Sequence, residues 1–233
     1  MIAVVLISSL AGGTTMAARA STPTGWATAS EITAFLNKER ADLKLSGLAV
    51  VVLAGGSVIF EGVFGDAAPG GPAVTLSTPF VLGSTSKQLT GLAIQHLIAQ
   101  RKVSLEDTVG SLLRRLGSAI SPFAGVTVAQ LLSHTSGISA GAGTADVFDP
   151  TPGFTSLGSE VRHLLMSSPS SEAGTRFEYS NGNYSLLGSI IEEVTGQSFE
   201  AALQGLVARP LGLDTTTSDR GCVGAVAVCC RPR

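Results

Sequence analysis

Cysteine is nearly absent from the sequence, which excludes a fold held together by a disulfide framework. The chain contains three cysteines, Cys222, Cys229 and Cys230, and all of them lie within the last dozen of its 233 residues. A structural zinc site would need four ligands at suitable spacing, and no histidine follows His163. We therefore expect neither disulfides nor a metal to hold residues 1–221 together.

Charge of either sign is also scarce. Only 14% of the residues are charged, and 15 Lys and Arg against 17 Asp and Glu leave a net charge of −2. This balance excludes a broad basic face, so we expect no nucleic-acid partner. Hydrophobic residues make up 44% of the chain, which is enough to bury a core. No internal run of 18 or more apolar residues exists, which excludes a polytopic membrane protein.

The first twenty residues have features of an export signal. They contain a short apolar run, Ile2 to Leu10, and a small-x-small cleavage pattern at Ala18-Arg19-Ala20, although no basic residue precedes the run. We expect a signal peptide at 1–20 and a periplasmic or extracellular protein with no stable membrane span after cleavage. The protein would stay tethered to the membrane if the segment is not cleaved. A buried N-terminal strand or helix is the alternative.

The pattern along the chain predicts a helix, a hairpin, a buried helix and then a series of helices. The first helix covers residues 26–43 with Ser30 as its cap, and the runs Leu48–Ala54 and Ser57–Phe64, separated by Gly-Gly, form the hairpin. Ser86 to Ala99 is apolar almost all round, which indicates a central helix. From residue 103 strand patterns vanish. Helical periodicity is found in Val109–Leu116, Val126–Ser133, Ser159–Met166, Gly182–Thr195 and Phe199–Ala208.

One serine has a lysine three residues later, at the start of the buried helix. Ser84-Thr85-Ser86-Lys87 is the only Ser-x-x-Lys in the chain. Residues i and i+3 lie on one face of a helix, so Lys87 can reach the Ser84 hydroxyl. A serine hydroxyl is a poor nucleophile until a nearby base takes its proton, and apolar surroundings favour the neutral lysine that can do this. A helix cap at Ser84, with Lys87 extending outward, is the alternative.

A partner for Lys87 is predicted at Tyr179-Ser180-Asn181, just before another apolar helix. A buried ammonium group favours the phenolate and lowers the pKa of a tyrosine from about 10, so Tyr179 can act as a general base or acid. Asn181 can donate to a substrate carbonyl or hold the lysine. Ordinary core packing of Tyr179 and a helix N-cap at Asn181 are the alternatives.

Four segments in this order resemble a known family. FVLGSTSKQLTGLAIQHLIAQRKVSLEDTVGSLL, VAQLLSHTSGI, FEYSNGNYSLLGSIIEEVTG and PLGLDTT are similar to the serine β-lactamase and penicillin-binding-protein superfamily, in its class C, D-Ala-D-Ala carboxypeptidase and esterase branch. The resemblance implies that Ser84 is the acylated nucleophile and Lys87 its activating partner. It also implies proton transfer by Tyr179 and substrate binding by Asn181.

The same resemblance implies an α/β plus all-α fold of the β-lactamase/transpeptidase type, with the site between the two domains and no cofactor. We expect residues 21–102 to form the N-terminal part of the α/β domain, including the nucleophile helix, and residues 103–219 to form the helical domain. The implied substrate is a β-lactam, a D-Ala-D-Ala peptide of the peptidoglycan type or a small ester. The residues of this sequence do not discriminate between these three substrate classes.

The family's third motif, Lys or His followed by Thr or Ser and Gly, has no counterpart here, because no Lys or His follows His163. The resemblance ends near Asp219, and residues 220–233 form a Cys-containing tail of different composition. We expect a truncated or frame-shifted product that lacks the family's C-terminal strands and last helix; a natural short form is the alternative. Loss of one oxyanion donor costs about 100- to 1,000-fold in rate. The prediction is an impaired hydrolase, with a non-catalytic or acylation-only penicillin-binding remnant as the alternative.

A second serine also lies in a motif known from hydrolases. Gly137 to Gly141 matches Gly-x-Ser-x-Gly, the nucleophile elbow of α/β-hydrolases, which needs a strand before it and a helix after it. A plain glycine-rich loop is the simpler interpretation. Asp146, Asp149 and His163 nevertheless follow in an order that suits a triad, so an esterase that uses Ser139 remains an alternative.

Two other histidines are predicted to be structural. His134, in LLSHTSGI, is a loop residue by the resemblance to the family. His96 falls on the face of Leu92 in the apolar helix. We therefore expect His96 to be a hydrogen-bonded core residue.

Overall fold

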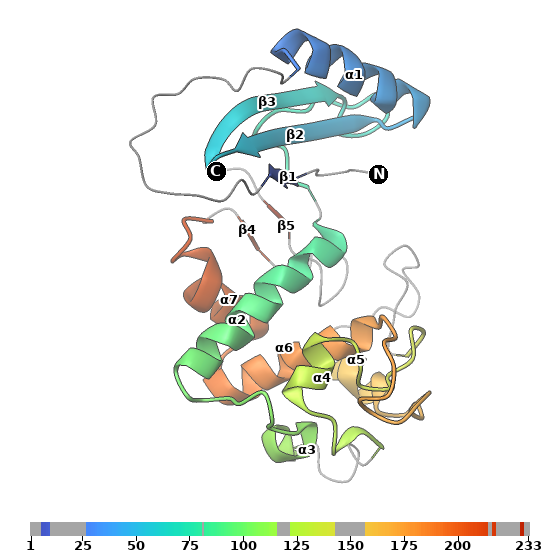
Figure 1. The fold of residues 1–233 in the computed structure, drawn as a ribbon, viewed down its shortest axis with the longest axis vertical. Helices are drawn as coiled ribbons and strands as arrows, with labels where there is room; N and C mark the ends of the chain where they lie inside the picture. The colour runs from blue at the N-terminus through green and yellow to red at the C-terminus, as the bar shows by residue number, and fades with distance from the viewer. Residues whose placement is uncertain are drawn as a thin grey trace. The chain divides into compact units, whose positions relative to one another are not determined.

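The chain divides into two compact units at Phe80/Val81. A computed structural model of the protein describes residues 6–9, 27–80, 82–115, 122–142, 157–213, 216–217 and 229–230 (Figure 1). The predicted cleavage site after Ala20 lies outside the described residues, as do Asp146 and Asp149. In the part of the chain that is described, no helix is long and apolar enough to cross a membrane.

The first unit contains a three-stranded sheet of order β1-β2-β3. β2 (Gly47–Ala54) and β3 (Ser57–Gly65) are antiparallel and form the hairpin that the sequence predicted. Gly55 and Gly56 link them with positive φ angles of 57° and 79°, which is the turn geometry that favours two glycines. β1 (Leu6–Ser9) pairs parallel with β2. Four residues of the predicted export segment are thus part of a strand, while the cleavage remains a prediction.

The helix α1 (Ala29–Asp42) begins earlier than Ser30, so the predicted cap is wrong. Thr28 is the cap: its hydroxyl accepts the Glu31 N–H at 3.2 Å, and its own N–H donates to the Glu31 carboxylate at 2.7 Å. The reason is local, because Glu31 stands three residues after Thr28 and completes a reciprocal capping box.

α1 contributes little to the core of its unit. Ile32 and Leu36 pack against the sheet core of Leu48, Val50 and Phe60. Phe35 of α1 and Leu43, its C-cap residue, are 60% and 64% exposed. The apolar contact between α1 and the sheet core therefore rests on Ile32 and Leu36.

The second unit is built around α6 (Asn181–Thr195) (Figure 1). It contacts α2 (Lys87–Ala99), α3 (Val109–Leu112), α4 (Val128–Leu132), α5 (Leu157–Leu164) and α7 (Phe199–Leu203). α7 continues directly into the π-helical turn η3 (Gln204–Ala208). Leu186, Leu187, Ile190 and Ile191 of α6 are completely buried. The predicted helices are therefore present. Several of them, such as α3 and α4, cover fewer residues than the ranges that their periodicity predicted.

α2 is buried along one side only. Ala93, Ile94 and Leu97 are fully buried, whereas Leu92 is 44% exposed and His96 is exposed. The prediction that His96 is a core residue is wrong, because residues 92 and 96 share a face that turns away from the helical core. α2 belongs to the second unit, so the division of the structure differs from the boundary that we expected after residue 102.

Strands also occur after residue 103, contrary to our expectation. β4 (Thr216–Thr217) and β5 (Cys229–Cys230) pair antiparallel. Each has two residues, which is too short to leave an alternating pattern in the sequence.

Candidate active site

Ser84 and Lys87 lie at the junction between a 3-10 turn and α2. The turn η1 (Gly83–Ser86) begins with a positive φ of 53° at Gly83, and the Ser86 hydroxyl donates to the Gly83 carbonyl at 2.6 Å. Lys87 is the first residue of α2 and is only 7% exposed. Its ammonium donates to the Ser84 hydroxyl at 3.3 Å. Lys87 therefore turns inward onto Ser84, which rules out the outward-pointing alternative.

Tyr179 and Asn181 join this pair from a segment some 95 residues further along the chain. The hydroxyls of Ser84 and Tyr179 share a hydrogen bond of 2.7 Å. The Lys87 ammonium donates to the Asn181 side-chain oxygen at 2.7 Å, and the Tyr179 hydroxyl donates to the same oxygen at 3.3 Å. These four residues, here called the Ser84 cluster, are thus brought together as the sequence predicted.

The alternatives for Tyr179 and Asn181 are wrong. Tyr179 is 42% exposed, so it is not an ordinary core residue. Ser180 is the N-cap of α6, and Asn181 is the first helical residue. The Asn181 side chain is consequently available to Lys87 instead of capping the helix.

The electrostatics of the cluster favour ionisation of one tyrosine over the other. Burial alone raises the pKa of Tyr179, but the hydrogen bonds from Lys87 and Ser84 and the positive charge of Lys87 outweigh it and leave that pKa below its usual value. Burial, and then the charge of Tyr179, raise the pKa of Tyr184. The Lys87 nitrogen lies 5.0 Å and 5.5 Å from the centres of the two rings. The phenolate therefore forms preferentially at Tyr179, next to Ser84.

A buried carboxyl, that of Glu160, is close enough to the cluster to feel the charge of Lys87. Glu160 of α5 is 7% exposed and accepts a hydrogen bond from the Ser185 hydroxyl. Burial raises the pKa of Glu160, while Ser185 and the charge of Lys87 act in the opposite direction. No ion pair among the described residues includes Lys87, so its ammonium is held by the uncharged oxygens of Ser84 and Asn181.

This geometry can activate a hydroxyl for attack on a carbonyl. A nucleophile in hydrogen-bond contact with a proton acceptor, which is itself oriented by a third group, is the general arrangement for covalent catalysis. Ser84 supplies the hydroxyl, Tyr179 the acceptor, and Lys87 the charge that stabilises the phenolate. The described residues contain no group of His, Cys, Asp and Glu that could hold a metal ion.

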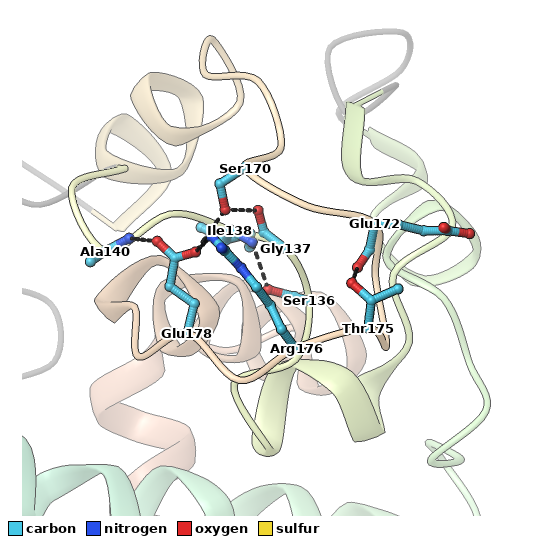
Figure 2. Close-up of polar contacts among 9 residues, drawn as sticks. All are labelled: Ser136, Gly137, Ile138, Ala140, Ser170, Glu172, Thr175, Arg176 and Glu178. Atoms are coloured by element: carbon cyan, nitrogen blue, oxygen red, sulfur yellow. Dashed lines mark hydrogen bonds and ion pairs between the residues drawn. The ribbon is translucent and has the colours of Figure 1, made fainter.

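Ser139 is not placed like a nucleophile elbow. It lies in a loop that follows α4, with no strand directly before it. The loop is fixed by Glu178, whose carboxylate accepts the Ala140 N–H at 2.9 Å (Figure 2). The α/β-hydrolase alternative is therefore wrong, because that motif requires a strand immediately before the serine.

His134, which the resemblance to the family predicts to be a structural loop residue, contacts the Ser84 cluster. Its ring lies 4.7 Å from the Tyr179 ring, centre to centre, and its Nδ1 accepts the Ser180 N–H at 3.2 Å. The only signal in the sequence is its position before the Thr-Ser-Gly turn, which does not reveal the partner segment.

The chain is similar to known proteins over most of its length. The model of the Beta-lactamase family matches residues 32–221, which is most of the chain. Esterase EstB from Burkholderia gladioli is 30% identical over 200 residues, covering 79% of this chain and 50% of the esterase.

Solved structures show the same fold. The octameric penicillin-binding protein homologue from Pyrococcus abyssi has a TM-score of 0.70 and 29% identity, over 80% of this chain and 44% of that protein. EstCE1, described as a hydrolase with promiscuous acyltransferase activity, has a TM-score of 0.68 and 26% identity, over 81% of this chain and 52% of its own. The chain thus spans about half the length of these proteins. The expected β-lactamase/transpeptidase-like fold is confirmed, and the chain belongs to the Beta-lactamase family.

Proposed function

We propose that the protein is a serine acyl-hydrolase that cleaves small esters through an acyl-enzyme on Ser84. The observation that carries the proposal is the 2.7 Å hydrogen bond between the hydroxyls of Ser84 and Tyr179, beside the buried ammonium of Lys87. An ester is favoured over a β-lactam or a D-Ala-D-Ala peptide because one similar protein is named an esterase and another a hydrolase with acyltransferase activity.

In the proposed reaction, the Ser84 oxygen attacks the ester carbonyl and its proton passes to the Tyr179 oxygen. The ammonium of Lys87 stabilises the phenolate before this transfer, and Asn181 keeps Lys87 in place. When the tetrahedral intermediate collapses, Tyr179 returns the proton to the departing alcohol. A water molecule then attacks the acyl-enzyme, gives a proton to Tyr179, and releases the acid as Ser84 regains its proton.

Export is part of the proposal. The apolar run Ile2 to Leu10 and the pattern Ala18-Arg19-Ala20 support it. Cleavage after Ala20 would remove β1 and leave the β2–β3 hairpin intact. N-terminal sequencing of protein recovered outside the cytoplasm tests both steps: Met1 retained there would contradict cleavage after Ala20, and absence of the protein from that fraction would contradict export.

The first experiment is the intact mass of the chain after treatment with a fluorophosphonate, beside the variants Ser84→Ala and Ser139→Ala. We expect one adduct on the parent and on Ser139→Ala, and none on Ser84→Ala. Ser139→Ala is the matched control because it removes the rival serine of the Gly-x-Ser-x-Gly loop. An adduct that persists in Ser84→Ala, or disappears in Ser139→Ala, contradicts the proposal.

The second experiment separates hydrolysis from acylation alone. We expect the parent to release p-nitrophenol from p-nitrophenyl butyrate and Ser84→Ala to release none. A stable adduct with benzylpenicillin and no ester turnover would instead identify an acylation-only, penicillin-binding protein. Robust turnover would contradict the predicted impairment while supporting the hydrolase.

A further inference from the structure

His134 stands at the end of α4, directly beside the Ser84 cluster. It follows the C-cap Ser133, and its φ angle of +56° is the left-handed conformation that commonly ends a helix. The His134 N–H donates to the Leu131 carbonyl at 3.3 Å and the Thr135 N–H to the Gln130 carbonyl at 2.9 Å, so the helix end fixes where His134 stands. Its imidazole lies against the rings of Tyr179 and Tyr184, with centres 4.7 Å and 5.3 Å away.

The imidazole also binds the backbone that leads into α6. Its Nδ1 accepts the Ser180 N–H at 3.2 Å and lies 3.0 Å from the side-chain nitrogen of Asn183. The orientation of the Asn183 amide is fixed by Ser136, whose hydroxyl donates to the Asn183 oxygen at 2.5 Å. Two donors therefore face Nδ1, which makes this nitrogen the acceptor and places the imidazole proton on Nε2.

Tyr179 is held on both sides by this one residue. The carbonyl of His134 accepts the Glu178 N–H at 2.8 Å, and its Nδ1 accepts the Ser180 N–H. Tyr179 stands between these two bonds, with its ring against the imidazole. The direction of its side chain, and hence the place of its hydroxyl, follows from the position of His134.

A second set of contacts fixes the same loop without contacting Tyr179. The Glu178 carboxylate accepts hydrogen bonds from Ala140 N–H at 2.9 Å, from the Ser170 hydroxyl at 2.8 Å and from Arg176 at 2.5 Å (Figure 2). Successive side chains of an extended segment point to opposite sides, so Glu178 faces the loop and Tyr179 faces Ser84. Glu178 is thus a control for effects of the loop as a whole.

We propose that His134 is a positioning residue for acyl transfer: by binding the Ser180 N–H and packing on the Tyr179 ring, it holds the phenol against the Ser84 hydroxyl. This inference rests on the proposed function of the Ser84 cluster. The inference adds His134 to the residues of the site, although His134 would contact neither the substrate nor Ser84.

The electrostatics are consistent with this role. Burial and then the positive charge of Lys87 lower the pKa of His134, so the imidazole is neutral near pH 7 and keeps its acceptor. The other titratable groups that face the imidazole are the phenols of Tyr179 and Tyr184. Protonation would place a second cation near Lys87 and would replace the acceptor by a donor.

The two tyrosines make a spectroscopic test possible, because Tyr179 and Tyr184 are the only ones in the chain. Phenolate absorbance at 295 nm is followed against pH in Tyr184→Phe, where Tyr179 alone titrates. We expect a midpoint below 10, the usual value for tyrosine. Adding His134→Asn should move the midpoint upward, because the phenol loses its fixed place beside Lys87. Asparagine is chosen because it tolerates the left-handed backbone.

The same variants are compared in the rate of Ser84 labelling by a fluorophosphonate. We expect His134→Asn to label about 10- to 100-fold more slowly, as for a lost positioning contact, and Glu178→Gln to keep the midpoint of Tyr179. An unchanged rate and midpoint in His134→Asn overturn the inference, as does an equal shift in Glu178→Gln. Labelling that persists in Ser84→Ala contradicts the proposed function instead, so the two failures are distinguishable.

A third measurement needs no substitution, and it decides the question even if His134→Asn does not fold. Nitrogen-15 NMR of the parent reports which imidazole nitrogen of His134 carries the proton. We expect an unprotonated Nδ1 that accepts a hydrogen bond, with the proton on Nε2. A protonated Nδ1 at pH 7 would overturn the inference, because it could not accept the Ser180 N–H.

Discussion

The helical unit and the sheet unit bury very different amounts of apolar surface. Among the described residues, the core of the helical unit contains twenty-four buried residues, whereas that of the sheet unit contains Leu48, Val50 and Phe60. All four residues of the Ser84 cluster lie in the helical unit. The site is therefore supported by the larger core, and we expect the sheet to be the less stable of the two.

The largest effect should come from making the same substitution in each core. Leu186 is fully buried in α6, and Leu48 is 5% exposed in β2. We expect Leu186→Ala to lower the free energy of unfolding by about 2–5 kcal/mol and to abolish labelling of Ser84. Leu48→Ala should cost less, because fewer neighbours surround it, and should leave labelling intact. Urea unfolding and intact mass measure both. Equal loss of labelling would show that the two units unfold together.

Hydrogen exchange compares the units without any substitution. Amides in the middle of α6 should exchange about 100-fold more slowly than those of β3, because exchange follows the local free energy of opening. Exchange followed by mass spectrometry of peptides from 186–195 and 57–65 gives the ratio. Similar exchange rates in the two peptides would contradict the expectation that the sheet unit is the less stable of the two.

Two glutamates should respond to pH with opposite signs. Burial raises the pKa of Glu160, so the folded state retains a proton that the unfolded state releases, and stability falls as the pH rises above about 4.5. Glu160→Gln keeps the acceptor for Ser185, so we expect its Tm at pH 7 to exceed that of the parent by about 2–4 °C. The difference should vanish near pH 4.

Glu31 is the matched glutamate of the sheet unit. The hydrogen bonds from the backbone and the side chain of Thr28 lower its pKa, so its contribution is present above pH 4.5 and is lost as the pH falls through the lowered pKa. Glu31→Gln should therefore decrease the Tm slightly at pH 7. Shifts of the same sign for both glutamates, measured by thermal unfolding from pH 4 to pH 8, would contradict this assignment.

Removing an exposed ion pair should have the smallest effect on stability, and the effect should be the same in both units. The exposed ion pairs Lys38–Asp42 of α1 and Arg115–Glu193 of the helical unit both have N–O distances of 2.5 Å. Lys38→Gln and Arg115→Gln should each change the free energy of unfolding by less than about 1 kcal/mol, and less still in high salt. A larger loss in either variant would mean that the pair belongs to a wider network.

Local patterns predicted the elements that local physics determines. The Gly55-Gly56 pair fixed the hairpin, and the i, i+3 spacing placed Lys87 on Ser84. The capping box of Thr28 and Glu31 is equally local, and it favours Thr28 over the predicted cap Ser30. That Tyr179 and Asn181 meet this pair came from the resemblance to a family, since nothing local joins segments so far apart.

Other features could not be predicted because they depend on tertiary packing. The sequence pattern of α2 is apolar nearly all round, and only the fold determines that His96 is exposed. Likewise, only the fold brings the imidazole of His134 to Ser180 and Asn183. A single sequence shows the residue but not these partners.

The separation of Ser84 from Tyr179 along the chain has a consequence for synthesis. At about 5–20 residues per second, a ribosome makes the serine some 5–20 s before its proton acceptor. Until α6 has emerged and packed on α2, Ser84 lacks both Tyr179 and Asn181. A nascent chain thus carries a serine without these two partners, and under the proposed function Ser84 would become reactive only when the helical unit is complete.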